Sequence, residues 1–192
     1  MDLFSPTSAL VVVDMQNDFT DPTGSLSVGG GEVVLGTVNA AIIRAVTSGS
    51  PVFYTQDWHP ESTPHFAKDG GIWPVHCVGG TWGAELHPRL IVAGPIVRKG
   101  TNGEDGYSGF TMRHPTSGDT IPTELESLLT GIEQVVVVGL ALDYCVKDTA
   151  LDAARLGFTT HVPRATTAAV NLDPGDGERA AATLAAAGVS VV

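Results

Sequence analysis

The chain has 192 residues, 43% of them hydrophobic, and a formal net charge of −11. This length suits one domain over residues 1–192, and the apolar content is sufficient for a core, which excludes a disordered chain. With only 10 Lys and Arg against 21 Asp and Glu, the surface lacks the cations that nucleic acids and anionic membranes require, so we expect neither as a partner.

The chain has few features of an exported or membrane-inserted protein. It opens with Met-Asp-Leu-Phe, with no positive segment ahead of an apolar one, so we expect no secretory signal. The longest apolar runs are far shorter than the ~20 residues that span a bilayer. Two cysteines cannot form a disulfide framework and are typical of thiols in a reducing compartment. We therefore expect a cytoplasmic protein.

Apolar runs that indicate buried strands alternate with stretches at helical spacing. A polar stretch at about 58–89 is long for a loop in a compact domain, and such loops are usually functional. In chain order we expect a strand at 8–14, a helix at 31–48, a strand at 51–57, the long loop, a strand at 95–98, a loop at 100–108, a short helix at 123–129, a strand at 134–140, a helix at 144–156, a strand at 159–162, a helix at 175–187 and a strand at 189–192.

Nearly continuous apolar strands separated by helices predict a parallel sheet that is covered on both faces. The expected fold is therefore α/β, with three α/β/α layers around a central, mostly parallel sheet of about six strands, as in Rossmann-like folds. Ligands of such folds bind beyond the carboxyl ends of the strands. The residues that follow each strand are thus the first candidates for a functional site.

Cys145 lies where the predicted strand 134–140 turns into a helix. The amides at a helix N-terminus favour a thiolate and can also stabilise an oxyanion. The alternative is a small buried hydrophobic residue, which many lone cysteines are.

Asp14 and Lys99 follow two other predicted strands. Asp14 could accept the thiol proton of Cys145, because burial would raise its pKa, and Lys99 could hold the pair in place. Taken singly, Asp14 could be a turn residue and Lys99 a solvated side chain. It is less expected that all three residues have unrelated structural roles at their strand ends than that they form one functional site.

Three of the six histidines of the chain lie between positions 59 and 76, next to an aspartate at the end of a predicted strand. One carboxylate and three neutral imidazoles suit a divalent transition metal such as Zn, Fe or Mn. The candidate ligands are Asp57, His59, His65 and His76. Four aromatic residues lie near these candidates and could form a slot for a small planar ring, or they could be ordinary core residues; they are Phe19, Trp73, Tyr107 and Tyr144.

Six segments, in this order, carry a resemblance to a known family. They are VDMQNDF at 13–19, DWHP at 57–60, WPVHCVGGTWGA at 73–84, RKG at 98–100, YSGF at 107–110 and GLALDYCV at 139–146. Together they resemble the nicotinamidase (pyrazinamidase) branch of the isochorismatase-like cysteine hydrolases, and the resemblance covers nearly the full length. It implies a catalytic triad of Asp14, Lys99 and Cys145 and the metal ligands Asp57, His59, His65 and His76.

The resemblance also implies the surroundings of the nucleophile. A cis peptide between Leu140 and Ala141 would turn the Ala141 N–H toward the substrate, beside the N–H of Cys145, and these two donors would form the oxyanion hole. Many relatives have Thr where this chain has Leu142, and some have His or another residue where it has Tyr144. The loop from 99 to 107 is slightly expanded. These departures border the pocket and bear on substrate preference. The expected pocket wall consists of Phe19, Trp73, Tyr107 and Leu140, with Tyr144 at its border.

The implied activity is that of a metal-dependent amidohydrolase. It would convert nicotinamide to nicotinate and ammonia, and pyrazinamide to pyrazinoate, through a cysteine thioester. The cofactor would be one divalent transition metal ion, and the partner a small-molecule substrate from NAD salvage. The alternatives are a related amidase that acts on another small amide, a non-catalytic module and a structural zinc site, which would favour thiolate ligands. The sequence leaves open whether the protein is a monomer or a homo-oligomer.

Overall fold

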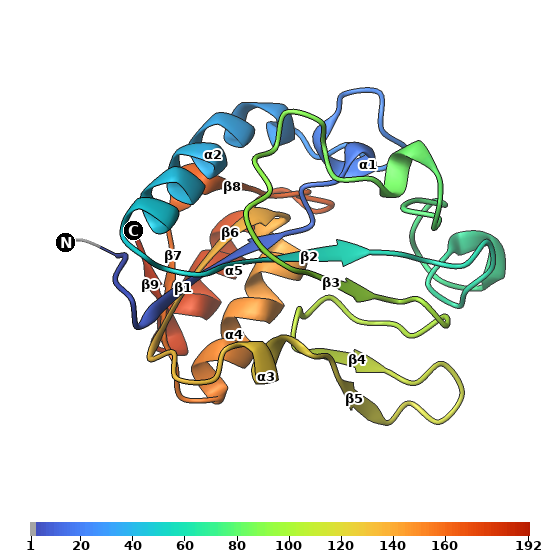
Figure 1. Ribbon diagram of the computed structural model, residues 1–192. Coiled ribbons are helices and arrows are strands. Elements are labelled where there is room, and N and C mark those ends of the chain that lie inside the picture. Colours follow the sequence, from blue (N-terminus) through green and yellow to red (C-terminus); the bar gives the residue numbers. More distant parts are fainter. Residues whose placement is uncertain (1–2) are drawn as a thin grey trace.

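The computed structural model describes residues 3–192 and is built around one twisted, parallel sheet (Figure 1). The strand order is β3-β2-β1-β6-β7-β9, and the short β8 pairs with β6 as a seventh strand. The strands are β1 (Ser8–Val13), β2 (Val52–Asp57), β3 (Ile96–Lys99), β6 (Gln134–Leu140), β7 (Thr159–Val162), β8 (Thr167–Ala168) and β9 (Ser190–Val191).

The sheet is covered by helices on both faces, because its central strands are apolar on both sides. In β1, Leu10 and Val12 pack into the cluster that contains α2 (Gly31–Thr47), whereas Val11 packs into the opposite cluster. The opposite face carries α3 (Leu125–Leu128), α4 (Lys147–Arg155) and α5 (Asp176–Ala186) (Figure 1). The predicted three-layer α/β/α fold with a mostly parallel sheet is confirmed.

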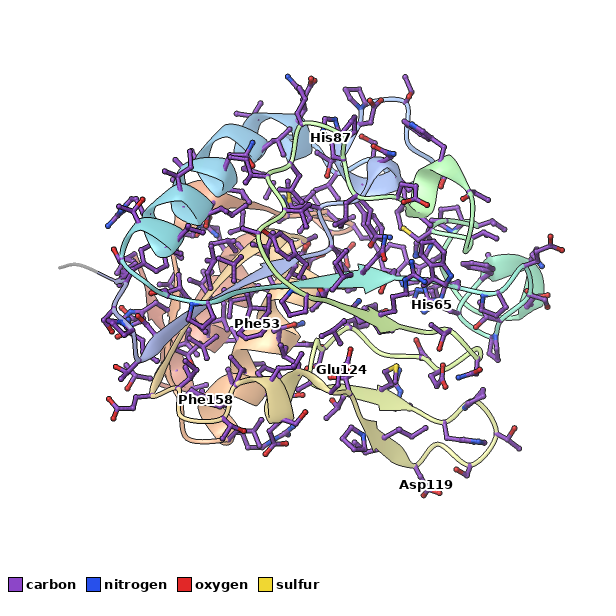
Figure 2. All side chains as sticks on the ribbon, viewed as in Figure 1. Phe53, His65, His87, Asp119, Glu124 and Phe158 are labelled. Carbon is purple, nitrogen blue, oxygen red and sulfur yellow. The ribbon has the colours of Figure 1, made fainter. Side chains whose placement is uncertain are left out.

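The segment between the third and fourth long strands contains a hairpin that the sequence did not indicate. Strands β4 (Thr111–Arg113) and β5 (Thr120–Pro122) pair antiparallel with each other and stand apart from the main sheet. Figure 2 labels Asp119 at its tip. Each strand is only three residues long, which is too short for an alternating pattern to be recognised.

The expected helix at 144–156 begins differently from the prediction. A π-helical turn, Leu142–Val146, comes first and α4 follows it directly. The long loop 58–89 holds only two short 3₁₀ turns, Ala67–Asp69 and Trp82–Ala84, as expected of a functional loop. A short helix, α1 (Asn17–Thr20), follows β1, and another 3₁₀ turn, Arg164–Thr166, precedes β8. Within residues 3–192, no helix is both long and apolar enough to cross a bilayer.

The parallel register brings the candidate residues to one edge of the sheet. Asp57 at the end of β2 lies opposite Lys99 at the end of β3, and Val13 of β1 lies opposite Gly139 of β6. Gly139 has a φ of 107°, and a Cβ there would come within 2.1 Å of the Val13 carbonyl oxygen, so only glycine lets the two strands end side by side.

Candidate active site at the carboxyl edge of the sheet

The structure brings together the three predicted triad residues. Asp14 directly follows β1 and is completely buried, Lys99 ends β3, and Cys145 lies in the π-helical turn after β6. The Lys99 ammonium donates a hydrogen bond of 2.8 Å to Asp14 Oδ2 and lies 3.7 Å from Cys145 Sγ. Ligand atoms of Asp14, Asp57 and Cys145 lie within 4.8 Å of one another. The thiol therefore has both an acid–base group and a cation within reach.

Lys99 is the electrostatic centre of this group. It is 1% exposed and donates hydrogen bonds to Asp14 and to Asp57. Burial alone would lower the pKa of the Lys99 ammonium, but the two carboxylates outweigh burial and hold it well above its usual value. A buried charge of this kind is tolerated because it is paired on both sides.

The two carboxyl groups beside Lys99 differ in their proton affinity. Burial raises the pKa of Asp14, and the nearby Asp57 carboxylate raises it further, against the opposing effect of Lys99. For Asp57, burial is outweighed by Lys99 and His59, which hold its pKa well below the usual range. Asp14 is thus the better proton acceptor of the pair, as a general base requires.

The Cys145 thiol is held in its protonated form at rest. Burial raises its pKa well above the usual value, Lys99 acts in the opposite direction, and Asp14 and Asp57 raise it further. The hydrogen bond between Cys145 and Asp14 contributes to the same shift. Nucleophilic attack by this sulfur therefore requires that its proton move to a neighbour, and Asp14 is in position to take it.

Two neighbouring side chains position the aspartates, and no pattern in the sequence points to their roles. Thr55 donates a hydrogen bond of 2.6 Å to Asp14 Oδ1. Gln16 clamps the main chain of Asp57: its amide nitrogen donates to the Asp57 carbonyl at 2.7 Å and its amide oxygen accepts the Asp57 N–H at 2.8 Å. Each aspartate therefore has a fixed orientation toward Lys99.

The peptide between Leu140 and Ala141 is cis, as the sequence resemblance implied. It joins the end of β6 to the turn that carries Cys145. Leu140, Ala141 and Cys145 all line the same pocket. The expected oxyanion donors, the N–H groups of Ala141 and Cys145, thus belong to two residues that line this pocket.

Three histidines converge beside the triad. Ligand atoms of His59, His65 and His76 lie within 4.8 Å of one another, and all three residues are buried. The ring centroids of His59 lie 4.9 Å from His65 and 5.3 Å from His76. Figure 2 shows His65 beyond the carboxyl end of β2. Side chains that are up to 17 positions apart along the chain thus form one compact donor group.

The fourth candidate ligand, Asp57, lies between the histidines and the triad. Its Oδ2 is 3.8 Å from His59 Nε2, while its Oδ1 accepts a hydrogen bond from Lys99. Its carboxylate therefore faces both groups. It connects the candidate metal ligands to the candidate nucleophile through Lys99.

The histidine group has the chemistry of a divalent-metal site. Both ring nitrogens of His59 are buried and find no hydrogen-bond partner among residues 3–192, which is costly unless something else binds them. Burial lowers the pKa of His76 to about 4, so its imidazole is neutral and can offer a lone pair at physiological pH. Its Nδ1 lies 2.7 Å from the Pro74 carbonyl oxygen, an acceptor only, so Nε2 is free to coordinate. The residues fit a divalent transition metal.

One pocket adjoins both groups, with about 390 Å³ of empty space, including open solvent at its mouth. All five expected wall residues line it, together with Leu26, Val28 and Val170, which the sequence did not single out. Trp73 Nε1 donates a hydrogen bond of 3.0 Å to the Tyr107 hydroxyl, and both rings meet Tyr144 edge-on. The expected wall residues are Phe19, Trp73, Tyr107, Leu140 and Tyr144.

Gly100 directly follows Lys99, the last residue of β3, and lies next to the histidine group. It has a φ of 79°, and a Cβ at this position would lie 2.6 Å from His59 Nδ1. The residue directly after Lys99 therefore packs against the ring of a candidate metal ligand, and only glycine leaves room for it.

A comparison with protein families agrees with this arrangement. The model of the isochorismatase domain matches residues 8–192. The chain belongs to the isochorismatase family. Within this family, the nicotinamidase of Escherichia coli is 35% identical over 206 aligned positions, which cover 97% of this chain and 94% of that protein.

Solved structures of family members have the same fold. The pyrazinamidase of Pyrococcus horikoshii, crystallised in complex with zinc, superposes with a TM-score of 0.85 at 37% identity and covers 97% of this chain and 99% of its own. PnC1 from L. infantum, crystallised in complex with nicotinate, has a TM-score of 0.87 at 40% identity and covers 98% of this chain and 94% of its own.

Proposed function

We propose that this protein is a nicotinamidase, a metal-dependent amidohydrolase that converts nicotinamide to nicotinate and ammonia and pyrazinamide to pyrazinoate. The single observation that carries the proposal is that Cys145, which lines an aromatic-walled pocket, meets the buried Asp14 and Lys99 next to three buried histidines. The family membership and the nicotinamidase and pyrazinamidase names of its relatives support the same reaction.

In the proposed first half-reaction, Asp14 accepts the thiol proton and Cys145 Sγ attacks the amide carbon. The charge that develops on the carbonyl oxygen is stabilised by the N–H groups of Ala141 and Cys145, and loss of one such donor costs about 10²–10³-fold in rate in comparable enzymes. The C–N bond then breaks as Asp14 returns the proton to the leaving nitrogen, so that ammonia departs and a thioester remains.

In the second half-reaction, Asp14 takes a proton from a water molecule, which attacks the thioester carbon. The C–S bond breaks, Asp14 returns its proton to the sulfur, and the acid product loses its remaining proton to solvent and leaves as the carboxylate. Throughout, Lys99 keeps Asp14 and Cys145 in place. Its ammonium compensates the negative charge of the Asp14 carboxylate or of the Cys145 thiolate, depending on which of them has lost its proton. Its hydrogen bond of 2.8 Å to Asp14 and its distance of 3.7 Å from Cys145 Sγ support this positioning role.

We propose that His59, His65 and His76, together with Asp57, hold the divalent metal ion. When bound, it would supply a Lewis acid beside the pocket. Zn, Fe and Mn are all compatible with imidazole and carboxylate ligands. The five aromatic and aliphatic wall residues would clamp a flat heteroaromatic ring and exclude bulkier amides. A cytoplasmic location, and the use of the product nicotinate in NAD salvage, belong to the same proposal.

The deciding experiment measures ammonia release from nicotinamide by metal-loaded protein, with and without a chelator. We expect turnover of nicotinamide and pyrazinamide that the chelator abolishes and added metal restores. A panel of aliphatic and carbamoyl amides, assayed in parallel, tests the alternative of a related amidase. Preference for one of these amides over nicotinamide would contradict the proposed substrate, and full activity in the chelator would contradict the metal requirement.

A further inference from the structure

Asp105 is an acidic residue of the loop between β3 and β4 that touches one of the candidate metal ligands. Its Oδ1 lies 2.8 Å from Nδ1 of His65, although the two residues are 40 positions apart in the chain. Its Oδ2 accepts a hydrogen bond from the guanidinium of Arg113, at the end of β4. The carboxylate thus lies between a histidine of the donor group and a cation of the hairpin.

The backbone of Asp105 is fixed as firmly as its side chain. Its N–H donates to the Arg113 carbonyl oxygen at 3.0 Å, and the Arg113 N–H donates back to the Asp105 carbonyl, so the two residues form an isolated antiparallel bridge. Side-chain and main-chain contacts to the same arginine determine where the carboxylate points. Both depend on the β4–β5 hairpin, which makes no contribution to the main sheet.

This contact determines which nitrogen of His65 is available. A carboxylate only accepts hydrogen bonds, so His65 Nδ1 carries the proton and Nε2 keeps its lone pair. His76 is held in the same way by the Pro74 carbonyl oxygen, but that partner belongs to the main chain. Among the three histidines as the structure describes them, His65 is the one with a ring nitrogen hydrogen-bonded to a charged side chain. Carboxylate partners of this kind also make an imidazole a stronger ligand.

We propose that Asp105, locked in place by Arg113, is a positioning residue for the metal centre and acts through His65. The inference rests on the proposed metal-dependent function and assigns the hairpin a part in it. Asp105 orients the His65 ring and strengthens its Nε2 as a donor, and Arg113 keeps Asp105 in the required position. The hairpin thereby controls how tightly the ion is held.

The primary test measures zinc affinity by competition with a chromophoric chelator, with no substrate present. Asp105→Asn keeps the size of the side chain but removes its charge, and we expect zinc to bind about 10–100-fold more weakly. Glu104→Gln is the matched control, because this neighbour makes the same charge change while its carboxylate accepts hydrogen bonds from Asn102 of its own loop. Zinc affinity of the control should equal that of the wild type.

The visible spectrum of the cobalt-substituted protein is a second measurement. It would not change if Asp105 only supported the fold. We expect the visible d–d bands of Co²⁺ to shift in Asp105→Asn and to stay unchanged in Glu104→Gln. Arg113→Gln should weaken zinc binding in the same direction but less. Because Arg113 acts through Asp105, the double variant should bind zinc no more weakly than Asp105→Asn alone.

Wild-type zinc affinity and an unshifted cobalt spectrum in Asp105→Asn would overturn the inference. If that variant does not fold, Arg113→Gln decides in its place, and wild-type affinity there has the same meaning. A separate measurement, of nicotinamide hydrolysis, distinguishes failure of this inference from failure of the proposed function. Zinc binding that weakens as expected in a protein that never hydrolyses nicotinamide would uphold the role of Asp105 and overturn the reaction. A wild-type protein that binds none of zinc, cobalt, iron and manganese would overturn both.

Discussion

The two halves of the site are supported by different parts of the molecule. The triad stands at or beyond the ends of strands: Asp14 follows β1, Lys99 ends β3, and Cys145 lies in the π-helical turn after β6. The histidines His65 and His76 lie on a long loop whose only regular structure is two 3₁₀ turns. The nucleophilic half is therefore positioned by the buried core of the sheet, and the ligand half by local hydrogen bonds and by the hairpin.

This difference predicts that the two halves can be disabled separately. A loss in the nucleophilic half should leave metal binding intact, whereas a loss in the ligand half should leave the core and its stability intact. Lys99 is the exception, because it donates to Asp14 of one half and Asp57 of the other. Four substitutions, from the largest expected effect to the smallest, test this separation.

Cys145→Ala removes the sulfur and should abolish turnover, with a loss of roughly 10³–10⁶-fold, as for other covalent nucleophiles. The ammonia assay measures the loss, and elemental analysis of the same sample should give the metal content of the wild type. Near wild-type turnover would rule out the thioester route. A missing metal ion would show that the halves are not separable.

Lys99→Met leaves the buried carboxylates of Asp14 and Asp57 without their cation. Removal of one partner from a buried ion pair typically costs about 3–5 kcal/mol, so we expect a loss of this size in the free energy of unfolding together with loss of activity. Denaturant titration measures the stability. Lys147→Met, which alters a partly exposed lysine of α4, should cost far less. Equal stability of the two variants would refute the central place of Lys99.

His59→Ala deletes a candidate ligand whose two ring nitrogens have no hydrogen-bond partner within residues 3–192. We expect metal affinity to fall by more than the roughly 10–100-fold that loss of a ligand's own partner costs. The free energy of unfolding of the metal-free protein should change little by comparison with Lys99→Met. His114→Ala, at an exposed position, serves as the control. An unchanged metal stoichiometry would remove His59 from the ligand group.

Thr55→Val tests the proton acceptor alone. The Thr55 hydroxyl stabilises the Asp14 carboxylate and lowers its pKa, so loss of the hydroxyl should raise that pKa. Because the reaction needs ionised Asp14, kcat/KM falls as the pH drops through this pKa, and the acid limb should move upward by about one pH unit. Thr160→Val, in β7, removes a buried hydroxyl away from the site and should leave the profile in place. An unmoved limb in Thr55→Val would mean that another group sets it.

The parts of this site that the sequence predicted are those governed by simple rules of the fold. Continuous apolar runs identify parallel strands, and polar residues directly after them meet at one edge, which brought Asp14, Lys99 and Cys145 together. The histidine cluster was visible because imidazoles are rare and close in sequence. The cis peptide and the Leu140 wall came from family resemblance rather than from pattern.

Other parts had no signal that a sequence could carry. Asp105 is one aspartate in a glycine-rich loop, and its contact with His65 depends on a hairpin whose strands are too short to show alternation. Leu26, Val28 and Val170 enter the pocket as single apolar residues of irregular segments. The start of α4 was misplaced because the π-helical turn at Cys145 has the composition of an ordinary helix.

The close packing of Gly100 against His59 has a consequence for how the protein can change. A single methyl group at position 100 would press on the imidazole and, one residue earlier along the backbone, disturb the amine that serves the sulfur. Ion retention and acyl transfer would then fail together, although their residues belong to separate structural supports. How well the protein tolerates a side chain at position 100 therefore measures how strongly ion retention and acyl transfer depend on each other.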